Sequence, residues 1–206
     1  QEFQSVGNLT LSEGRATCAG LSMIVAVHAE NADITDGLVA RVRAAGGKAA
    51  SDFLSSRPAI AKIEAIARAI SMARETRCSL HIVHVSTQAG LDLVAEARQA
   101  GVDVTCETCP QYLAFSADDL ERLGVGAKCQ PPLRTVADQR ALWRFLQEVP
   151  DAMMASDHSP APAKMRLEGD FVDSWGGIAG AQTTLAAILT RWPEGGPLRS
   201  DAARVF

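Results

Sequence analysis

The 206-residue sequence lacks long apolar runs, segments with charge of one sign and a recognisable signal peptide. Its 20 basic and 24 acidic side chains are mixed along the chain, so no basic stripe is available for a nucleic acid or an acidic membrane. No apolar run approaches the roughly 18 residues that span a bilayer. We therefore expect a cytoplasmic protein that binds neither nucleic acid nor membrane.

Signals for disulfide bonds and for nucleotide binding are also missing. The five cysteines are an odd number in a domain too large to need disulfides, which predicts reduced thiols. Cys106 and Cys109 form a C-x-x-C pair, but no second pair accompanies it, and the segment is predicted to be a strand rather than a helix start. No G-x-G-x-x-G or P-loop follows a predicted strand, which argues against a nucleotide-binding domain.

The sequence does contain a regular alternation of strand-like and helix-like segments. The predicted strands are Met23–His28, Leu80–Val85, Val102–Cys106 and Ala152–Ser156. The predicted helices are Pro58–Glu75, a helix around Leu91–Ala95 that ends at Gly101, Asp138–Leu146, Ala179–Leu189 and a less regular one within Gln1–Gly20. Such alternation predicts one α/β domain over residues 1–206 with parallel strands and right-handed crossovers. Its length fits either a small doubly wound sheet or half of a (β/α)₈ barrel.

Side chains that can bind metal stand where three of the predicted strands end. His28 and His84 end the first two strands, and Asp157 follows the fourth. Because the carboxyl ends of parallel strands point to one face, these side chains are expected to converge there. The alternative for any single histidine is a satisfied, partly buried side chain. By strand alternation, His81 is expected to face away from His84, and His158 away from Asp157.

Longer stretches of sequence resemble the cyclic amidohydrolases of the amidohydrolase superfamily, which include allantoinases, hydantoinases and dihydroorotases. The segments that carry the resemblance are His28–Asn31, Leu80–Ser86, Cys106–Leu113, Lys128–Arg134, Ser156–Pro160, Gly169–Phe171 and Trp175–Gly180. They occur in the family's order and at plausible spacings. The resemblance implies that the chain corresponds to about strands 5–8 of a (β/α)₈ barrel.

The resemblance also implies a site for two divalent metal ions, usually zinc. By position, His28 and His84 would bind one ion, and Asp157 would bind the other and transfer protons. Imidazole is a good zinc ligand, and a zinc-activated water attacks amide carbonyls. Backbone groups around Cys129–Gln130 and Gly176–Gly177 would hold a small cyclic ureide or imide, although simple turns are the alternative for the glycines. Family members form homo-oligomers, which we expect here too.

The expected activity is hydrolysis of allantoin to allantoate, favoured by the Trp175–Ile178 stretch. Hydantoinase, dihydropyrimidinase and dihydroorotase activities remain alternatives, and Gln111, where allantoinases often have histidine, weakens the preference for allantoin. The resemblance further implies a first-strand His-x-His and a carboxylated lysine that bridges the two ions, and the 206 residues contain neither. The chain alone is therefore expected to be inactive, and a metal-free scaffold is a further alternative. Lys62 stands where relatives usually have glutamate.

Overall fold

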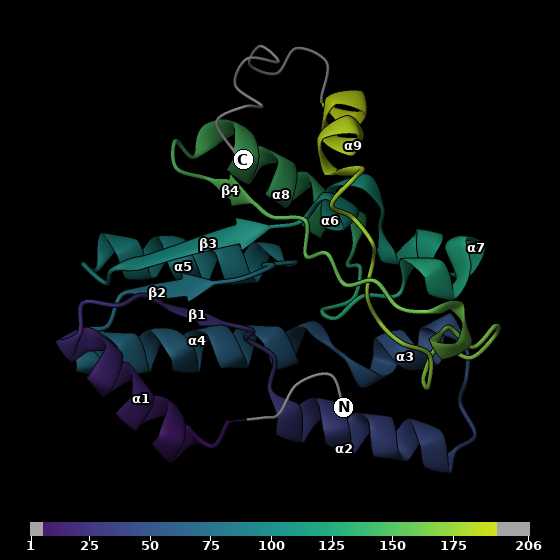
Figure 1. Cartoon of the computed structure of the whole chain (residues 1–206), viewed down its shortest axis with the longest axis horizontal. Helices are drawn as coiled ribbons and strands as arrows, with labels where there is room; N and C mark the ends of the chain where they lie inside the picture. The colour runs from purple at the N-terminus through teal and green to yellow at the C-terminus, as the bar shows by residue number, and fades with distance from the viewer. Residues whose placement is uncertain (1–5, 193–206) are drawn as a thin grey trace.

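A computed structural model describes residues 6–192, which contain a single parallel sheet (Figure 1). Its strands are β1 (Val25–Val27), β2 (Leu80–Ile82), β3 (Val104–Thr108) and β4 (Met153–Met154), and they lie in the order β1-β2-β3-β4. All three strand pairs are parallel. The predicted α/β class with parallel strands is therefore confirmed.

One helix precedes β1, and the others connect the strands or follow β4. The α-helices are α1 (Asn8–Gly20), α2 (Ala32–Ala44), α3 (Ala50–Ser56), α4 (Ala59–Thr76), α5 (Gln88–Gln99), α6 (Pro110–Ala114), α7 (Leu120–Leu123), α8 (Val136–Glu148) and α9 (Thr184–Arg191). Short 3₁₀ turns are η1 (Ala117–Asp119), η2 (Gly124–Ala127) and η3 (Ala163–Met165). Between residues 6 and 192 no helix is both long and apolar enough to cross a membrane.

Helix α4 shows why the predicted helix forms. Pro58 occupies the N-cap, where its missing N–H costs nothing, and alanine and isoleucine recur at spacings of three and four. The buried stripe includes Ala65, Ile66 and Ala69. The helix ends at Thr76, and the C-cap residue Arg77 has a φ of 56°, in the left-handed region that terminates many helices.

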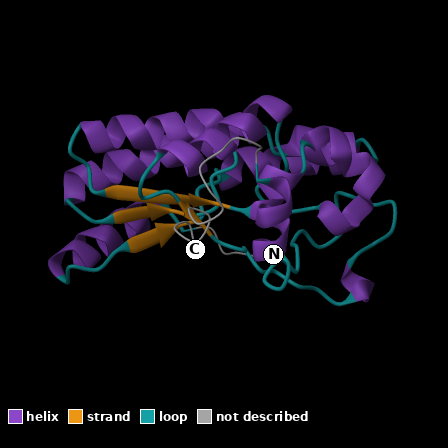
Figure 2. Cartoon of the chain, turned by 90° about the horizontal axis from the view of Figure 1, so that it is seen from above, coloured by secondary structure: helices purple, strands orange, loops and turns teal. Residues whose placement is uncertain are grey.

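One of the two hydrophobic core clusters of the described residues lies on the face of the sheet that α4 and α5 cover, and Figure 2 shows long helices along that side of the strands. The other cluster, which includes Tyr112 and Leu142, lies around α6 and α8. Leu80 and Ile82 point into the first cluster and are almost fully buried. On the opposite face Ala26 is exposed, and its register partner His81 is only partly buried. A doubly wound sheet has helices on both faces, whereas a barrel has them only outside. The arrangement is that of part of a (β/α) barrel.

Several boundaries differ from the predictions. Strands β1, β2 and β4 are shorter than their predicted segments, and β3 is shifted by two residues toward the C-terminus. His28, His84 and Asp157 therefore all lie just beyond strand ends. Strand alternation consequently does not extend from His81 to His84, and the argument that placed them on opposite faces does not apply. Helix α9 begins at Thr184 rather than near residue 179, and the last segment, 193–206, lies outside the described residues, as do residues 1–5 of the predicted first helix.

The prediction for the C-x-x-C pair was partly wrong. Cys106 lies within β3, but Cys109 is the N-cap residue of α6, directly before Pro110. The strand ends at Thr108, and Pro110 at the first helical position begins α6, because proline's fixed φ suits the start of a helix. Both thiols are free and buried, so the expectation of reduced cysteines stands for the described part of the chain.

Candidate functional site

Two of the predicted ligands, His28 and His84, are in direct contact. The loops after β1 and β2 bring Nδ1 of His28 to 2.9 Å from Nε2 of His84. Their rings meet edge to face with centroids 4.7 Å apart. The side chain of His28 is 26% exposed, whereas His84 is buried. The contact forms because β1 and β2 are parallel neighbours that end at the same edge of the sheet.

A buried lysine lies on the other side of His84. Lys62, in the second turn of α4, is fully buried, and its Nζ lies 3.3 Å from Nδ1 of His84 and 3.3 Å from the carbonyl oxygen of Val83. Burial lowers the pKa of Lys62 to about 8, against the opposing effect of the Glu30 carboxylate. Burial and then the charge of Lys62 lower the pKa of His84 well below its ordinary value, which keeps the imidazole neutral near pH 7.

A buried ion pair lies on the other side of His28. Oε2 of Glu30 is 3.4 Å from Nε2 of His28 and accepts a hydrogen bond of 2.7 Å from Nη1 of Arg57. Burial alone would raise the pKa of Glu30, but the hydrogen bond from His28 and the charge of Arg57 outweigh it and lower that pKa. Glu30 is therefore ionised at neutral pH, and it orients His28 much as a carboxylate orients a metal-binding imidazole.

Asp157, the third predicted ligand, does not join the two imidazoles to form a ligand cluster. Among the described residues no three His, Cys, Asp or Glu side chains are grouped closely enough to hold a metal ion. Asp157 is partly buried, and its charge acts on Lys62, Cys109 and Cys129. It therefore lies near the same end of the sheet as the histidine pair. His158 points elsewhere and accepts a hydrogen bond from the backbone N–H of Ala181.

The donor set fits a divalent ion in part. Two imidazoles in contact, at the mouth of a parallel sheet, are suitable ligands for zinc, which typically takes four. The remaining ligands are not supplied by a cluster within residues 6–192. Lys62 also presents a cation to the ring of one ligand. The imidazole pair can thus provide two ligands of a metal site, but not a complete one.

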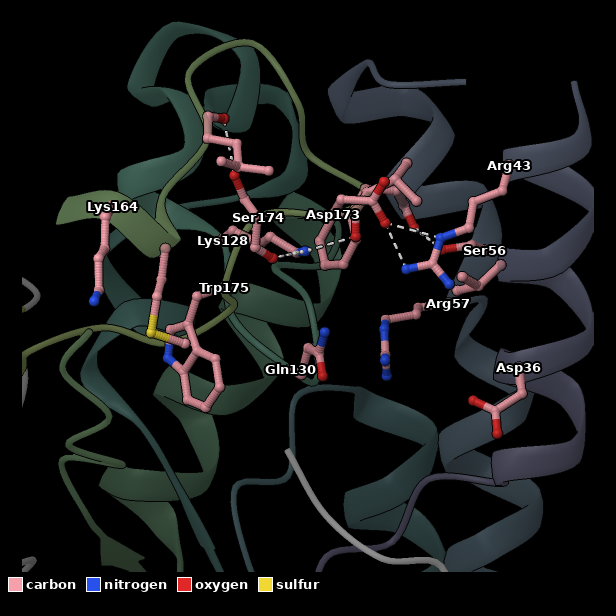
Figure 3. A pocket seen from close by; sticks show the side chains of 15 residues that line it. Asp36, Arg43, Ser56, Arg57, Lys128, Gln130, Lys164, Asp173, Ser174 and Trp175 are labelled. Carbon is pink, nitrogen blue, oxygen red and sulfur yellow. Dashed lines mark hydrogen bonds and ion pairs between the residues drawn. The ribbon is translucent and has the colours of Figure 1, made fainter. Parts of the chain in front are cut away.

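The predicted substrate-binding segments pack against each other beside a cavity of about 430 Å³. Gly177 donates its backbone N–H to the carbonyl oxygen of Lys128, and a Cβ at Gly176 would lie 3.2 Å from Cγ of Gln130. In Figure 3, Gln130 lies in the cavity with Trp175 on one side and Arg57 on the other. The thiol side chain of Cys129 is 1% exposed and belongs to the core, so only its backbone could face a ligand.

Gln130 also connects this cavity to the histidine pair. A second cavity, of about 540 Å³, is lined by Gln130, His28, Glu30 and Arg57 among others. The amide of Gln130 can therefore contact a molecule that also reaches His28. Lys62, Glu30 and Arg57 were not predicted as site residues. Of these three, Glu30 could have been found from the sequence, because it is a charged residue two positions after His28 and strand ends commonly carry functional side chains.

Comparison with known proteins supports the resemblance seen in the sequence. No family model matches the chain. It is 50% identical over 188 residues to an allantoinase of Rubrobacter xylanophilus, which covers 91% of this chain and 41% of that protein. It is 46% identical to an allantoinase of Deinococcus radiodurans over the same length, 42% of that protein. The chain thus spans about two fifths of the length of these curated relatives.

Solved structures with the same fold are hydantoinases. An L-hydantoinase (dihydropyrimidinase) from Arthrobacter aurescens superposes with a TM-score of 0.87 at 33% identity, over 98% of this chain and 44% of the other. A D-hydantoinase superposes with a TM-score of 0.90 at 27% identity, over the whole of this chain and 46% of the other. The chain therefore has the fold of part of these enzymes.

Proposed function

Because this chain belongs with the cyclic amidohydrolases related to allantoinase and hydantoinase, we propose that it supplies part of an active site that hydrolyses a ring amide. The observation that carries the proposal is the contact between His28 and His84, 2.9 Å apart, at the strand ends of a sheet that superposes on hydantoinases. Identity of 50% to an allantoinase over 91% of the chain supports the same chemistry.

In this proposal His28, His84 and Asp157 are metal ligands, and the ion is zinc. When bound, the ion supplies Lewis acidity to the carbonyl of the ring amide. Glu30 holds the imidazole of His28 in place through its 3.4 Å contact with Nε2, and Arg57 keeps that carboxylate charged. Further ligands come from the part of the relatives' length that lies outside these 206 residues.

Asp157 is the proposed catalytic residue. A carboxylate at the strand-end face can accept a proton from the attacking water and pass it to the leaving ring nitrogen. Gln130, with the backbone at Cys129, Gly176 and Gly177, is proposed to hold the edge of the substrate. Paired N–H and C=O groups of a cyclic ureide or imide match an amide side chain and neighbouring backbone groups.

Allantoin is the proposed substrate, because the curated relatives at 46–50% identity are allantoinases. Hydantoins and dihydropyrimidines are the second candidate, favoured by the superposition on hydantoinases and by Gln111. Dihydroorotate is a third cyclic amide of the same chemistry.

The test is ring opening by a metal-loaded protein that carries this chain within the relatives' full length. We expect allantoin to be opened fastest among allantoin, hydantoin, dihydrouracil and dihydroorotate. Asp157→Asn should lower kcat by about 10²- to 10⁴-fold, the usual contribution of a proton-transfer group. Asp118→Asn, at an exposed position in η1, is the matched control and should leave kcat unchanged.

Absence of ring opening with all four substrates would refute the proposed activity. Stoichiometric zinc that a chelator removes would exclude a metal-free scaffold, whereas a folded, inactive protein without zinc would support that alternative.

A further inference from the structure

Lys128 joins the two segments that are proposed to bind the substrate. Its side chain is 1% exposed, and its Nζ donates to the carbonyl oxygens of Ser174 and, at 3.2 Å, of Val172 (Figure 3). Its own carbonyl oxygen accepts a hydrogen bond of 2.8 Å from the backbone N–H of Gly177. Lys128 therefore contacts the 172–177 segment at three points, with both its backbone and its side chain.

The surroundings of Lys128 favour one position of that segment. Its Nζ also lies over the ring of Phe53, 4.8 Å from the centroid, and the face of an aromatic ring attracts a cation. Phe53 lies in α3 and is itself buried. A buried amine that loses its acceptors is costly, because it has given up water without a replacement. The segment consequently cannot move away without leaving donors of Lys128 unsatisfied.

A second cation, Arg166, contacts the end of the same segment. Its Nη2 donates to the carbonyl oxygen of Gly177, and its Nη1 lies 3.3 Å from the carbonyl oxygen of Gly126 and 3.4 Å from that of Val125. One guanidinium can make all three contacts because its donors form a fixed, planar fork. Both backbone groups of Gly177 are thus engaged within the protein, its N–H with Lys128 and its C=O with Arg166.

The segment held in this way sets the position of the Gln130 side chain. A Cβ at Gly176 would lie 3.2 Å from Cγ of Gln130 and 3.3 Å from its Nε2, so the amide packs directly against the bare backbone of the glycine. Gln130 lines both cavities, and Trp175 lines the one of about 430 Å³. A displacement of the segment would therefore move the amide that is proposed to hold the edge of the substrate.

We propose that Lys128 and Arg166 are positioning residues for substrate binding, which fix the 172–177 segment and thereby hold Gln130 where it meets the cyclic substrate. Neither cation touches the reacting atoms in this scheme. Both contribute to the affinity for the ring and not to proton transfer at Asp157. The inference rests on the proposed function, which assigns Gln130 and the glycine segment to the substrate.

The kinetics of ring opening by the full-length, metal-loaded protein test this role. Lys128→Met keeps the length of the side chain without its donors, and Arg166→Met removes the guanidinium. We expect each variant to raise KM roughly 10- to 100-fold, because a displacement of about 1 Å can cost that much. We expect kcat to stay within about 3-fold, since lost uniform binding raises KM alone. Arg122→Met, at a side chain in α7 that is 68% exposed, is the matched control and should change neither.

A fluorine label on tryptophan reports the position of the segment without any turnover. Trp175 lies within the segment, and Trp175→Phe assigns its ¹⁹F resonance in full-length protein labelled with 5-fluorotryptophan. We expect this resonance to shift in Lys128→Met and in Arg166→Met and to stay in place in Arg122→Met. Thermal melts establish that each variant is folded. Arg166 is only partly buried, so its variant tests the inference even if Lys128→Met does not fold.

The outcomes separate this inference from the proposed function. A raised KM with a shifted Trp175 resonance supports the inference. Unchanged KM in the folded variants, or a lowered kcat at unchanged KM, would overturn it and leave the proposed function standing. Absence of ring opening by the unaltered protein would overturn the proposed function. In that case a Trp175 resonance that does not shift would overturn the positioning of the segment too, whereas a shifted resonance would support it.

Discussion

Two of the proposed site residues adopt backbone conformations that side chains with a Cβ rarely take. His84 has a φ of 43° and Asp157 a φ of 44°, each just after a strand ends. Such left-handed residues cost on the order of 1–3 kcal/mol and occur preferentially at functional sites. His84 lies beyond the end of β2, where side chains no longer alternate between the two faces of the sheet. Its left-handed backbone conformation directs the ring toward His28.

The positive φ of His84 predicts that the usual order of stability, alanine above glycine, is reversed at this position. His84→Gly should be more stable than His84→Ala by about 1 kcal/mol, because glycine accepts a positive φ without penalty. His81 lies within β2, where glycine should instead be less stable than alanine by about 0.5–1 kcal/mol. Urea denaturation of the four variants checks the sign. The same order at both positions would contradict a strained backbone at His84.

The buried thiols give a prediction about pH. Burial raises the pKa of Cys106 and of Cys129 to about 12. A raised pKa leaves the thiol protonated at pH 8, and the thiolate is the reactive form, so both should react slowly with a disulfide reagent until the protein unfolds. Cys18 is partly exposed and should react first in the native chain. Peptide mapping after timed labelling identifies the site, and early labelling of Cys129 would argue against its core position.

Candidate site residues could be predicted where they follow a pattern along the sequence. They could not be predicted where only tertiary contacts bring them to the site. His28, His84 and Asp157 follow apolar strands, so the sequence marked them as candidates; the structure brings His28 and His84 together, and the roles of all three stay predictions. Lys62 was visible as an unusual residue in a helix, but its contact with His84 depends on how α4 packs on β2. Hydrophobic periodicity predicts which side of a helix is buried, but it does not predict that the amine of Lys62 contacts the ring of His84.

At the scale of elements, α2 was missed because its apolar stripe is thin. Only Thr35 is fully buried along it, so the hydrophobic pattern gave little signal. Its caps were informative: the side chain of Asn31 accepts from the N–H of Ile34, and Arg41 and Arg43 lie in the last turn. Helices α4, α5 and α8 were predicted correctly because each buries a continuous stripe.

The loop that carries Gly176–Gly177 should tolerate no added side chain. A Cβ at Gly177 would lie 2.5 Å from the backbone oxygen of Ser159, which cannot yield without moving the loop. Gly177→Ala should therefore lower the melting temperature by several degrees, as a loss of about 1–3 kcal/mol does. Gly126→Ala has nothing within 4 Å of its Cβ and is the control. Equal melting temperatures, read by calorimetry, would show that the loop is not docked as described.

At the scale of the whole molecule, the described sheet has an unprotected edge. β1 pairs only with β2 in the described residues, and Leu21, Met23 and Ile24 beside it are each more than half exposed. An open edge flanked by apolar side chains favours association. The expected homo-oligomer stays a prediction, and this edge is where the 206-residue chain alone would self-associate.

Ile24→Lys should reduce that association, because a charge beside an edge strand opposes strand pairing. Sedimentation velocity over a range of concentrations should show larger species for the unaltered chain than for this variant. Ile60→Lys, at an equally exposed position in the first turn of α4, should behave like the unaltered chain. An unaltered chain that stays monomeric throughout would contradict the prediction.

The order of the sheet, β1-β2-β3-β4, is also the order of the chain. During translation each new strand can therefore dock on the edge left by the one before it, without waiting for a later segment to be inserted between them. The two imidazoles can meet once β1 and β2 have emerged from the ribosome, whereas Asp157 arrives only after two further crossovers. A nascent chain would thus hold the histidine pair, already in contact with Lys62 and Glu30, well before the proposed proton-transfer residue Asp157 has been added.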